Sequence, residues 1–170
     1  MGDALGVRAR GRPEVVLPML VAWIYGAVFA TKPAPVSPLH GLDARTETRA
    51  TWRIGMIHGA LAIPGTTDGD EVVINVDEIA TSGLDYLALG HWHSTLTARA
   101  GDVRYGYSGA PEPVAVDQDR AGNVLLVTLD MVHGARTVSV EARAGGRTRF
   151  ERLDIDAAAM PTQAPLIERL

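Results

Sequence analysis

The chain has 170 residues and a mass of 18.1 kDa, the size of one ordinary domain or of a piece of a larger one. Hydrophobic residues make up 46% of the chain and charged residues 21%, which excludes a disordered or a fibrous protein. Because the chain has no cysteine, disulfides, thiolate metal sites and cysteine nucleophiles are excluded, and a transition-metal site must use His, Asp, Glu or Asn. The net charge of −4 argues against a broadly basic nucleic-acid surface.

Near the amino end, a mostly apolar run at residues 15–30 follows three arginines, an arrangement also found in signal peptides. The run is shorter than the roughly 20 residues of a membrane-spanning helix, and Pro18 interrupts it. Val, Ile, Trp, Tyr and Phe dominate residues 21–29, and these residue types favour a buried strand. We therefore predict a strand here and keep the signal peptide as the alternative. The proline-rich residues 32–38 predict a surface connection.

The rest of the chain reads as short strands with few helices. Charged residues predict a short exposed helix at 43–49, and Asn75, two acidic residues and Gly83 predict a capped helix over 75–83. Apolar runs predict strands at residues 52–57, 86–89, 103–107, 123–130 and 137–142, and a short extended piece at 71–74. The last two of these strands are predicted to pair as a hairpin through His133 and Gly134.

Histidines follow two of these predicted strands directly. His58 comes after residues 52–57, and His91 and His93 come after residues 86–89. A metal-binding imidazole needs a rigid support, and the end of a strand provides one while its loop leaves room for substrate. We predict that His58, His91 and His93 are metal ligands. His40 and His133 lie in predicted loops without comparable context and are left unassigned.

The same segments resemble a known family. Gly-His-Trp-His at 90–93 is similar to the closing Gly-His-x-His motif of calcineurin-like metallophosphoesterases, and residues 54–59 resemble the single-histidine motif that precedes it. Tyr-Ser-Gly-Ala-Pro at 107–111 and Ile-Tyr-Gly at 24–26 resemble the SbcD-like DNA-repair exonuclease branch. The resemblance covers residues 20–130, and its ordered combination of motifs is more specific than any one of them.

The resemblance implies an α/β (α+β) fold, part of a two-sheet β-sandwich flanked by helices. It implies a site with two divalent metal ions, most often manganese, in which His58 and His91 bind one ion and His93 the other. Tyr107, Ser108 and Gly109 become candidates for a substrate loop. The implied activity is metal-dependent phosphodiester hydrolysis of the DNA-exonuclease type, with DNA and a coiled-coil ATPase of the SbcC type as partners. We expect a cytoplasmic protein without a membrane partner.

The amino-terminal motifs of that family do not occur in this sequence. Asp-x-His, Gly-Asp-x-x-Asp and Gly-Asn-His are all missing, so the bridging carboxylate and the catalytic histidine are missing as well. Residues 1–144 therefore resemble the carboxyl-terminal half of the domain, and residues 145–170 the start of an accessory region or a tail. A gene fragment, a split gene completed by a separate chain, and a decayed paralogue all fit this pattern. The first candidates for additional ligands are four aspartates near the motif histidines: Asp43, Asp68, Asp70 and Asp85.

Two other classes of protein stay open. An amidohydrolase also uses His-x-His on a strand, but its motif opens the chain and further ligands follow, whereas only His133 follows here. A non-catalytic binding or structural domain is the second alternative, because three histidines without carboxylates make a weak two-metal site.

Overall fold

The computed structural model describes residues 21–27, 36–63, 72–118, 120–151 and 154, and the backbone of residues 14–17. In this part of the chain strands predominate and one short α-helix is present, so the expected mixture of strands with few helices is confirmed. No helix among the described residues is long and apolar enough to cross a membrane.

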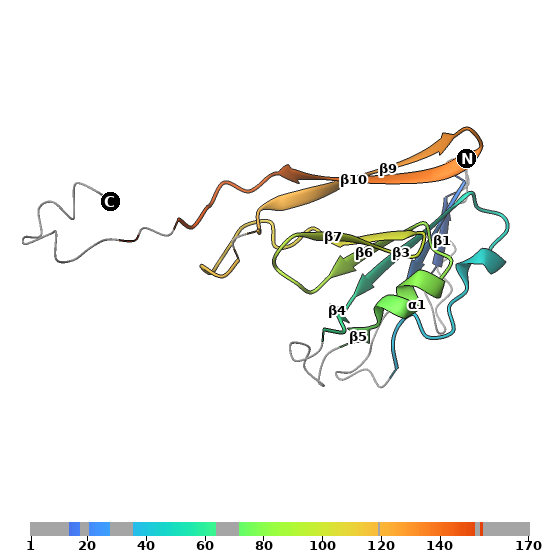
Figure 1. Ribbon diagram of the computed structural model, residues 1–170, viewed down its shortest axis with the longest axis horizontal. Helices are drawn as coiled ribbons and strands as arrows, with labels where there is room; N and C mark the ends of the chain where they lie inside the picture. Colours follow the sequence, from blue (N-terminus) through green and yellow to red (C-terminus); the bar gives the residue numbers. More distant parts are fainter. Residues whose placement is uncertain are drawn as a thin grey trace, which may run out of the picture.

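The centre of the molecule is a six-stranded sheet in the order β1-β2-β3-β6-β8-β7 (Figure 1). Its four central strands run parallel, and the two edge strands are antiparallel to their neighbours. In chain order the strands are β1 Glu14–Leu17, β2 Ala22–Gly26, β3 Trp52–His58, β6 Tyr86–Gly90, β7 Leu96–Ala100 and β8 Val103–Tyr107.

One face of this sheet carries the main hydrophobic core. Side chains at alternate positions of the central strands point into it, which is the period expected of a half-buried strand. The core-facing residues of these strands include Trp23, Tyr25, Ile57, Leu87, Leu89 and Tyr107. Helix α1 (Val76–Thr81) covers this face through Ile79, and the short parallel pair β4 (Ala60–Leu61) and β5 (Val73–Ile74) closes one end.

The opposite face is partly covered by a long hairpin. Strands β9 (Asn123–Val132) and β10 (Ala135–Ala144) pair with each other along their whole length and lie over the sheet as a second layer (Figure 1). Leu125 of β9 packs on Gly106, where a Cβ atom would lie 2.8 Å from the leucine Cδ1, so a glycine allows the layers to approach. Arg136 of β10 forms an ion pair with Asp85 at 3.1 Å and fixes the other end of the hairpin.

Most predicted elements are confirmed. The strands at 52–57, 86–89 and 103–107, the helix after Asn75 and the hairpin through His133 and Gly134 all occur, with the hairpin strands longer than predicted. The apolar run near the amino end contains strands β1 and β2, and residues 18–20 and 28–30 lie outside the described part. The predicted helix at 43–49 is a single 3-10 turn at Ala44–Thr46.

The sequence did not predict β7, β4 or the separate strand β1. Beyond β10, the backbone N–H groups of residues 145–148 donate hydrogen bonds to the Gly122 carbonyl and to the Glu112 carboxylate. The segment after the proposed boundary at 144 therefore begins in contact with the folded part.

Candidate functional site

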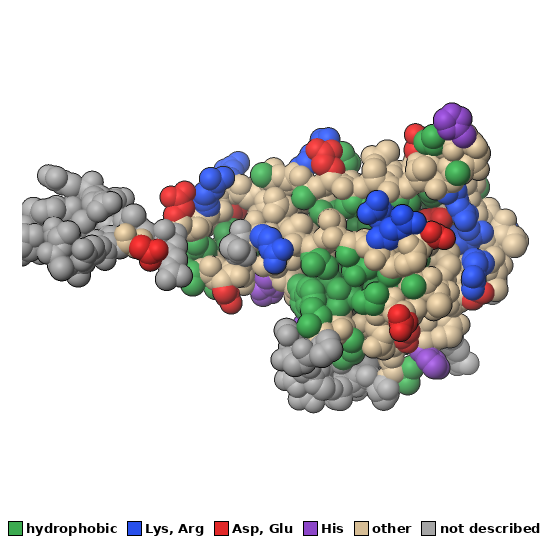
Figure 2. Space-filling model, in the orientation of Figure 1, with side chains coloured by type: hydrophobic (Ala, Val, Ile, Leu, Met, Phe, Trp, Pro, Cys, Tyr) green, Lys and Arg blue, Asp and Glu red, His purple; other side chains and the backbone are tan. Residues whose placement is uncertain are grey.

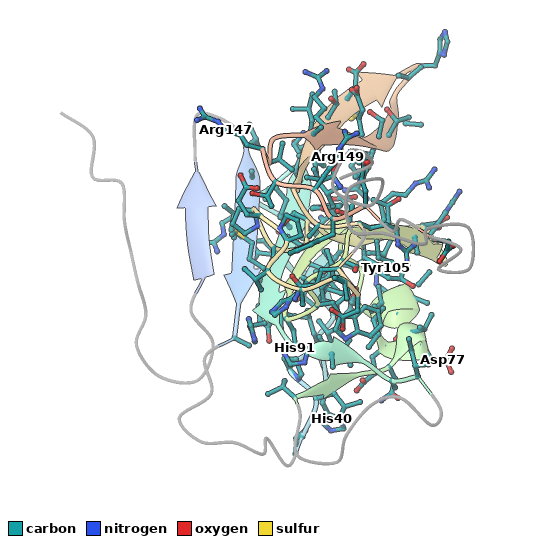
Figure 3. The ribbon with its side chains drawn as sticks, turned by 90° about the vertical axis from the view of Figure 1, so that its left-hand side faces the viewer. His40, Asp77, His91, Tyr105, Arg147 and Arg149 are labelled. Carbon is teal, nitrogen blue, oxygen red and sulfur yellow. The ribbon has the colours of Figure 1, made fainter. Side chains whose placement is uncertain are left out.

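The structure brings His58 and His91 together at one end of the central sheet. His58 is the last residue of β3, it lies opposite Gly90 of β6 in the parallel register, and His91 follows immediately. The two imidazole rings are 5.4 Å apart between centroids and perpendicular to each other. Figure 3 shows His91 at the end of the sheet from which β4 and β5 extend. Adjacent parallel strands therefore present two of the three predicted metal ligands at one place.

The backbone of His91 adopts a conformation that side-chain-bearing residues rarely take. Its φ is +132°, in the region that favours glycine. Such backbone strain is concentrated at functional sites, where the surrounding structure holds a residue in place. Here the backbone N–H of Gly59 donates a hydrogen bond of 2.9 Å to the Gly90 carbonyl, which ties the two histidine-bearing strand ends together.

His93 lies apart from this pair. A nitrogen-to-nitrogen hydrogen bond of 2.7 Å joins its Nδ1 to Nε2 of Gln118. Among the residues that the structure describes, no three His, Asp or Glu side chains are grouped closely enough to hold a metal ion. The described part of the chain thus unites two of the three predicted ligands. Gln118 had no sequence signal, because it stands alone in a loop outside every motif.

The loop after β8 supports the histidine motif through its backbone. The Ala110 N–H donates a hydrogen bond of 2.8 Å to the His93 carbonyl. Gly109 has a φ of +85°, and a Cβ atom there would lie 2.5 Å from the same carbonyl oxygen, so only glycine fits. Ser108 is exposed, and its carbonyl accepts a hydrogen bond of 2.8 Å from the Thr95 hydroxyl.

Tyr107, the first of the three substrate-loop candidates, is fully buried. Its ring stacks on Trp92, with centroids 4.8 Å apart and planes 19° apart. Its hydroxyl donates a hydrogen bond of 2.7 Å to the carbonyl of Gly59. Tyr107 therefore positions the strand ends, while Ser108 is the candidate with a side chain open to solvent.

The candidate carboxylates do not join the histidines. Asp85 precedes β6, at the opposite end of that strand from His91, and both its oxygens are engaged by Arg136 and by the backbone N–H of Arg53. Asp43 pairs with Arg45 at 2.7 Å, and the hydrogen bonds from Arg45 lower the pKa of this carboxyl. Asp68 and Asp70 lie outside the described residues.

No protein-family model matches this sequence, and no curated protein matches it either.

The chemistry of the donor set defines what this site can hold. Neutral imidazole is a good ligand for divalent transition metals, and a catalytic ion usually has at least three protein ligands. His58 and His91 supply two, and no described carboxylate is grouped with them to bridge a second ion. The described residues thus fit part of a metal site and do not fit a complete two-metal centre.

Proposed function

We propose that this chain contributes the histidine half of a metal-dependent phosphodiesterase site, in a metallophosphoesterase-like domain of the DNA-exonuclease type. The observation that carries the proposal is the pairing of the His58 and His91 rings at adjacent parallel strand ends. The order of the motifs along the chain, His58 before Gly-His-x-His before the Gly109 loop, supports the same assignment.

The layered arrangement is compatible with half of a two-sheet β-sandwich. Strands β9 and β10 lie over the central sheet, and among the described strands they pair only with each other. In the proposal, additional polypeptide extends this second sheet and brings the carboxylates and the catalytic histidine that the present sequence lacks. That polypeptide is either a separate chain or a further segment of the same protein. DNA is the proposed substrate, and a coiled-coil ATPase of the SbcC type the proposed partner.

In the completed site two divalent ions, with manganese as the first choice, would activate a water molecule and stabilise the charge on the phosphodiester oxygens. The residues of this chain would supply only some of the ligands for these ions. His58 and His91 place their two imidazole rings side by side, and the Gly59–Gly90 hydrogen bond keeps the two strand ends in register. His93 takes part as a third ligand only if it leaves its hydrogen bond with Gln118.

Metal titration of single variants tests the histidine assignment. Calorimetry with Mn²⁺ should show an affinity at least about tenfold lower for His58→Ala and for His91→Ala, because each removes one of few ligands. His133→Ala and His40→Ala are the controls, since both histidines are exposed and lie in turns, not at the ends of central strands. Equal weakening by His133→Ala would overturn the assignment.

Complementation tests the activity. The chain alone should show little hydrolysis of bis-p-nitrophenyl phosphate. A polypeptide with the Asp-x-His, Gly-Asp-x-x-Asp and Gly-Asn-His motifs should restore manganese-dependent cleavage that His91→Ala abolishes. Rapid hydrolysis by the chain alone would contradict the proposal.

A non-catalytic domain with a residual histidine pair is the second candidate. It is favoured by the lack of any three-ligand group within the described residues. The complementation experiment separates the two, because a residual pair would gain no activity from the added polypeptide.

A further inference from the structure

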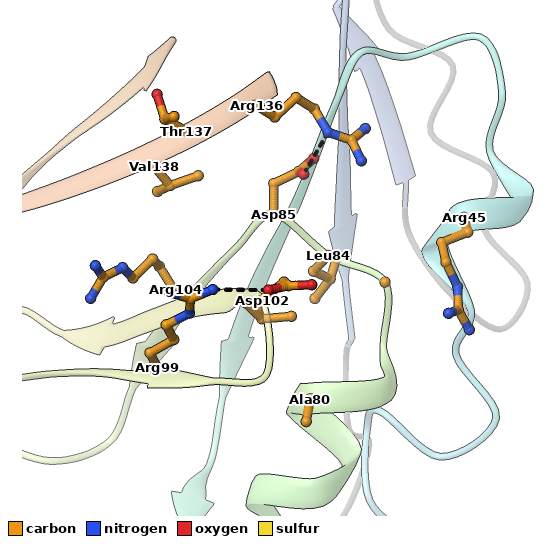
Figure 4. Close-up of a pocket in the computed structure, with 12 residues that line it drawn as sticks. Arg45, Ala80, Leu84, Asp85, Arg99, Asp102, Arg104, Arg136, Thr137 and Val138 are labelled. Atoms are coloured by element: carbon orange, nitrogen blue, oxygen red, sulfur yellow. Dashed lines mark hydrogen bonds and ion pairs between the residues drawn. The ribbon is translucent and has the colours of Figure 1, made fainter. Parts of the chain in front are cut away.

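A second site lies at the other end of the sheet. A cavity of about 590 Å³ opens between the hairpin and the amino ends of β6 and β8. Its wall includes Asp85, directly before β6, and Arg104, the second residue of β8, whereas His58 and His91 lie at the carboxyl ends of their strands. Figure 4 shows the cavity with side chains from both layers around it. The cavity is therefore separate from the histidine pair.

Arginines dominate the polar side chains of this cavity. Arg45, Arg99, Arg104 and Arg136 line it, against the carboxylates of Asp85 and Asp102. Figure 2 shows basic side chains on this face of the molecule, below the turn end of the hairpin. Four arginines against two aspartates make the cavity wall basic, although the whole chain has a net charge of −4.

Three of the four arginines already have a carboxylate partner. Arg136 pairs with Asp85 at 3.1 Å, Arg99 with Asp102 at 2.8 Å, and Arg45 with Asp43 outside the cavity wall. Arg104 is exposed and forms no ion pair with any residue that the structure describes. Among the described residues, Arg104 is therefore the cavity-lining arginine without a carboxylate partner.

The paired arginines use only part of their guanidinium groups for these contacts. Arg136 uses Nε for Asp85 and donates from Nη1 to the Thr51 carbonyl, while Asp85 also accepts the backbone N–H of Arg53. Arg99 uses Nε for the Gly101 carbonyl and one terminal nitrogen for Asp102. Each of these two guanidiniums keeps further N–H donors, and both side chains are about half exposed. Guanidinium groups that keep further N–H donors are suited to bidentate binding of an anion.

We propose that this cavity binds a small phosphate-bearing ligand, with Arg104 as the principal contact and with Arg99 and Arg136 as additional donors. Its volume is within the range of about 300–1,000 Å³ typical of small-molecule sites. One guanidinium that has no carboxylate partner within the described part of the chain, placed between two layers, favours a compact phosphate over a nucleic-acid backbone, which is typically bound by a row of basic residues. The proposal does not depend on the metal site.

Calorimetric titration with inorganic pyrophosphate tests whether the cavity binds phosphate. The full chain is used at low salt, after a chelating resin has removed metal ions. The wild type should bind with one-to-one stoichiometry, and Arg104→Gln should weaken binding about tenfold or more, the usual effect of losing a charge-assisted contact. Arg143→Gln is the matched control: Arg143 pairs with Glu141 near the opposite end of β10 and does not line the cavity. His91→Ala should leave pyrophosphate binding unchanged, so failure of the metal-site proposal would not affect this test.

Three results would overturn the proposal. The first is the absence of saturable pyrophosphate binding. The second is an equal loss of affinity in Arg143→Gln, which would indicate a general charge effect. The third is tighter binding of a short single-stranded oligothymidylate than of pyrophosphate with the same dependence on Arg104, which would identify a nucleic-acid backbone as the ligand.

Discussion

The hydroxyl of Tyr107 donates a hydrogen bond to the backbone carbonyl of Gly59, 2.7 Å away, between residues 48 positions apart in the chain. This contact joins the end of β8 to the end of β3, directly after His58. Trp92 stacks on the same tyrosine ring. The positions of its two neighbours in the chain, His91 and His93, therefore depend on this buried side chain.

Replacement of Tyr107 by phenylalanine should destabilise the protein by about 1–2 kcal/mol, because the Gly59 carbonyl loses its partner in a buried environment. Urea unfolding at neutral pH measures the change. Tyr105→Phe is the matched control, since Tyr105 lies in the same strand and its hydroxyl makes no hydrogen bond with the described residues. Similar losses from both substitutions would show that the Tyr107 hydrogen bond contributes nothing specific.

Replacement of Gly109 by alanine should be more damaging than replacement of Gly134. Both glycines have positive φ, +85° and +79°, so each substitution costs about 1–2 kcal/mol of backbone strain. At Gly109 the new Cβ would also lie 2.5 Å from the His93 carbonyl oxygen, whereas nothing lies within 4 Å at Gly134. Urea midpoints should therefore fall further for Gly109→Ala, and identical midpoints would contradict the steric argument.

The strained backbone at His91 gives a third prediction. At a φ of +132°, His91→Gly should be more stable than His91→Ala by about 1–2 kcal/mol, because glycine adopts this conformation at little cost. Both variants lack the imidazole, so their difference isolates the backbone. Thermal unfolding of the two metal-free proteins provides the measurement. Equal melting temperatures would mean that the site stores no strain.

The stability contributed by helix α1 should depend on pH through Glu78. Burial raises the pKa of this carboxyl, but hydrogen bonds from Asn75 and Ser37 lower it by more, so the net pKa lies below its ordinary value. A lowered folded-state pKa means that the carboxylate stabilises the protein above about pH 4.3 and loses this contribution as the pH falls through the folded-state value.

Glu78→Gln should therefore reduce the loss of stability on acidification. We expect the difference from wild type to be below about 1 kcal/mol, because the side chain is partly exposed to solvent. Urea unfolding between neutral pH and pH 3 compares the two proteins. A variant that loses as much stability as the wild type would show that Glu78 has no part in the acid response.

Local sequence signals were sufficient for most of the central sheet. Trp52–His58 and Tyr86–Gly90 are apolar and bounded by turns, and Asn75 and Gly83 mark the helix between them, so each could be predicted from its neighbours. Strand β7, Leu96–Ala100, was missed because an edge strand with Thr and Arg at alternate positions has no distinct apolar run.

Local sequence signals were likewise sufficient for only part of the candidate sites. The meeting of His58 and His91 follows from two parallel strands that end side by side, which the chain order implies. The hydrogen bond between His93 and Gln118, which lies 25 residues further along the chain, had no such signal in the chain order. The arginine cavity forms only where the hairpin meets the sheet, and no local pattern encodes that contact.

The connectivity of the strands has a consequence for how the molecule folds. Strands β9 and β10 are joined by a two-residue turn, and such hairpins form within about 1–10 μs. The parallel pair β3–β6 needs closure of a long loop, as in the contact between Arg53 and Asp85, which are 32 residues apart. Because an isolated two-stranded ribbon is at best marginally stable in water, the early hairpin gains little until the slower parallel pairing supplies the surface on which it packs. Its apolar side chains, Leu125 and Val127 among them, stay open to solvent during that interval, so aggregation competes with folding at this stage.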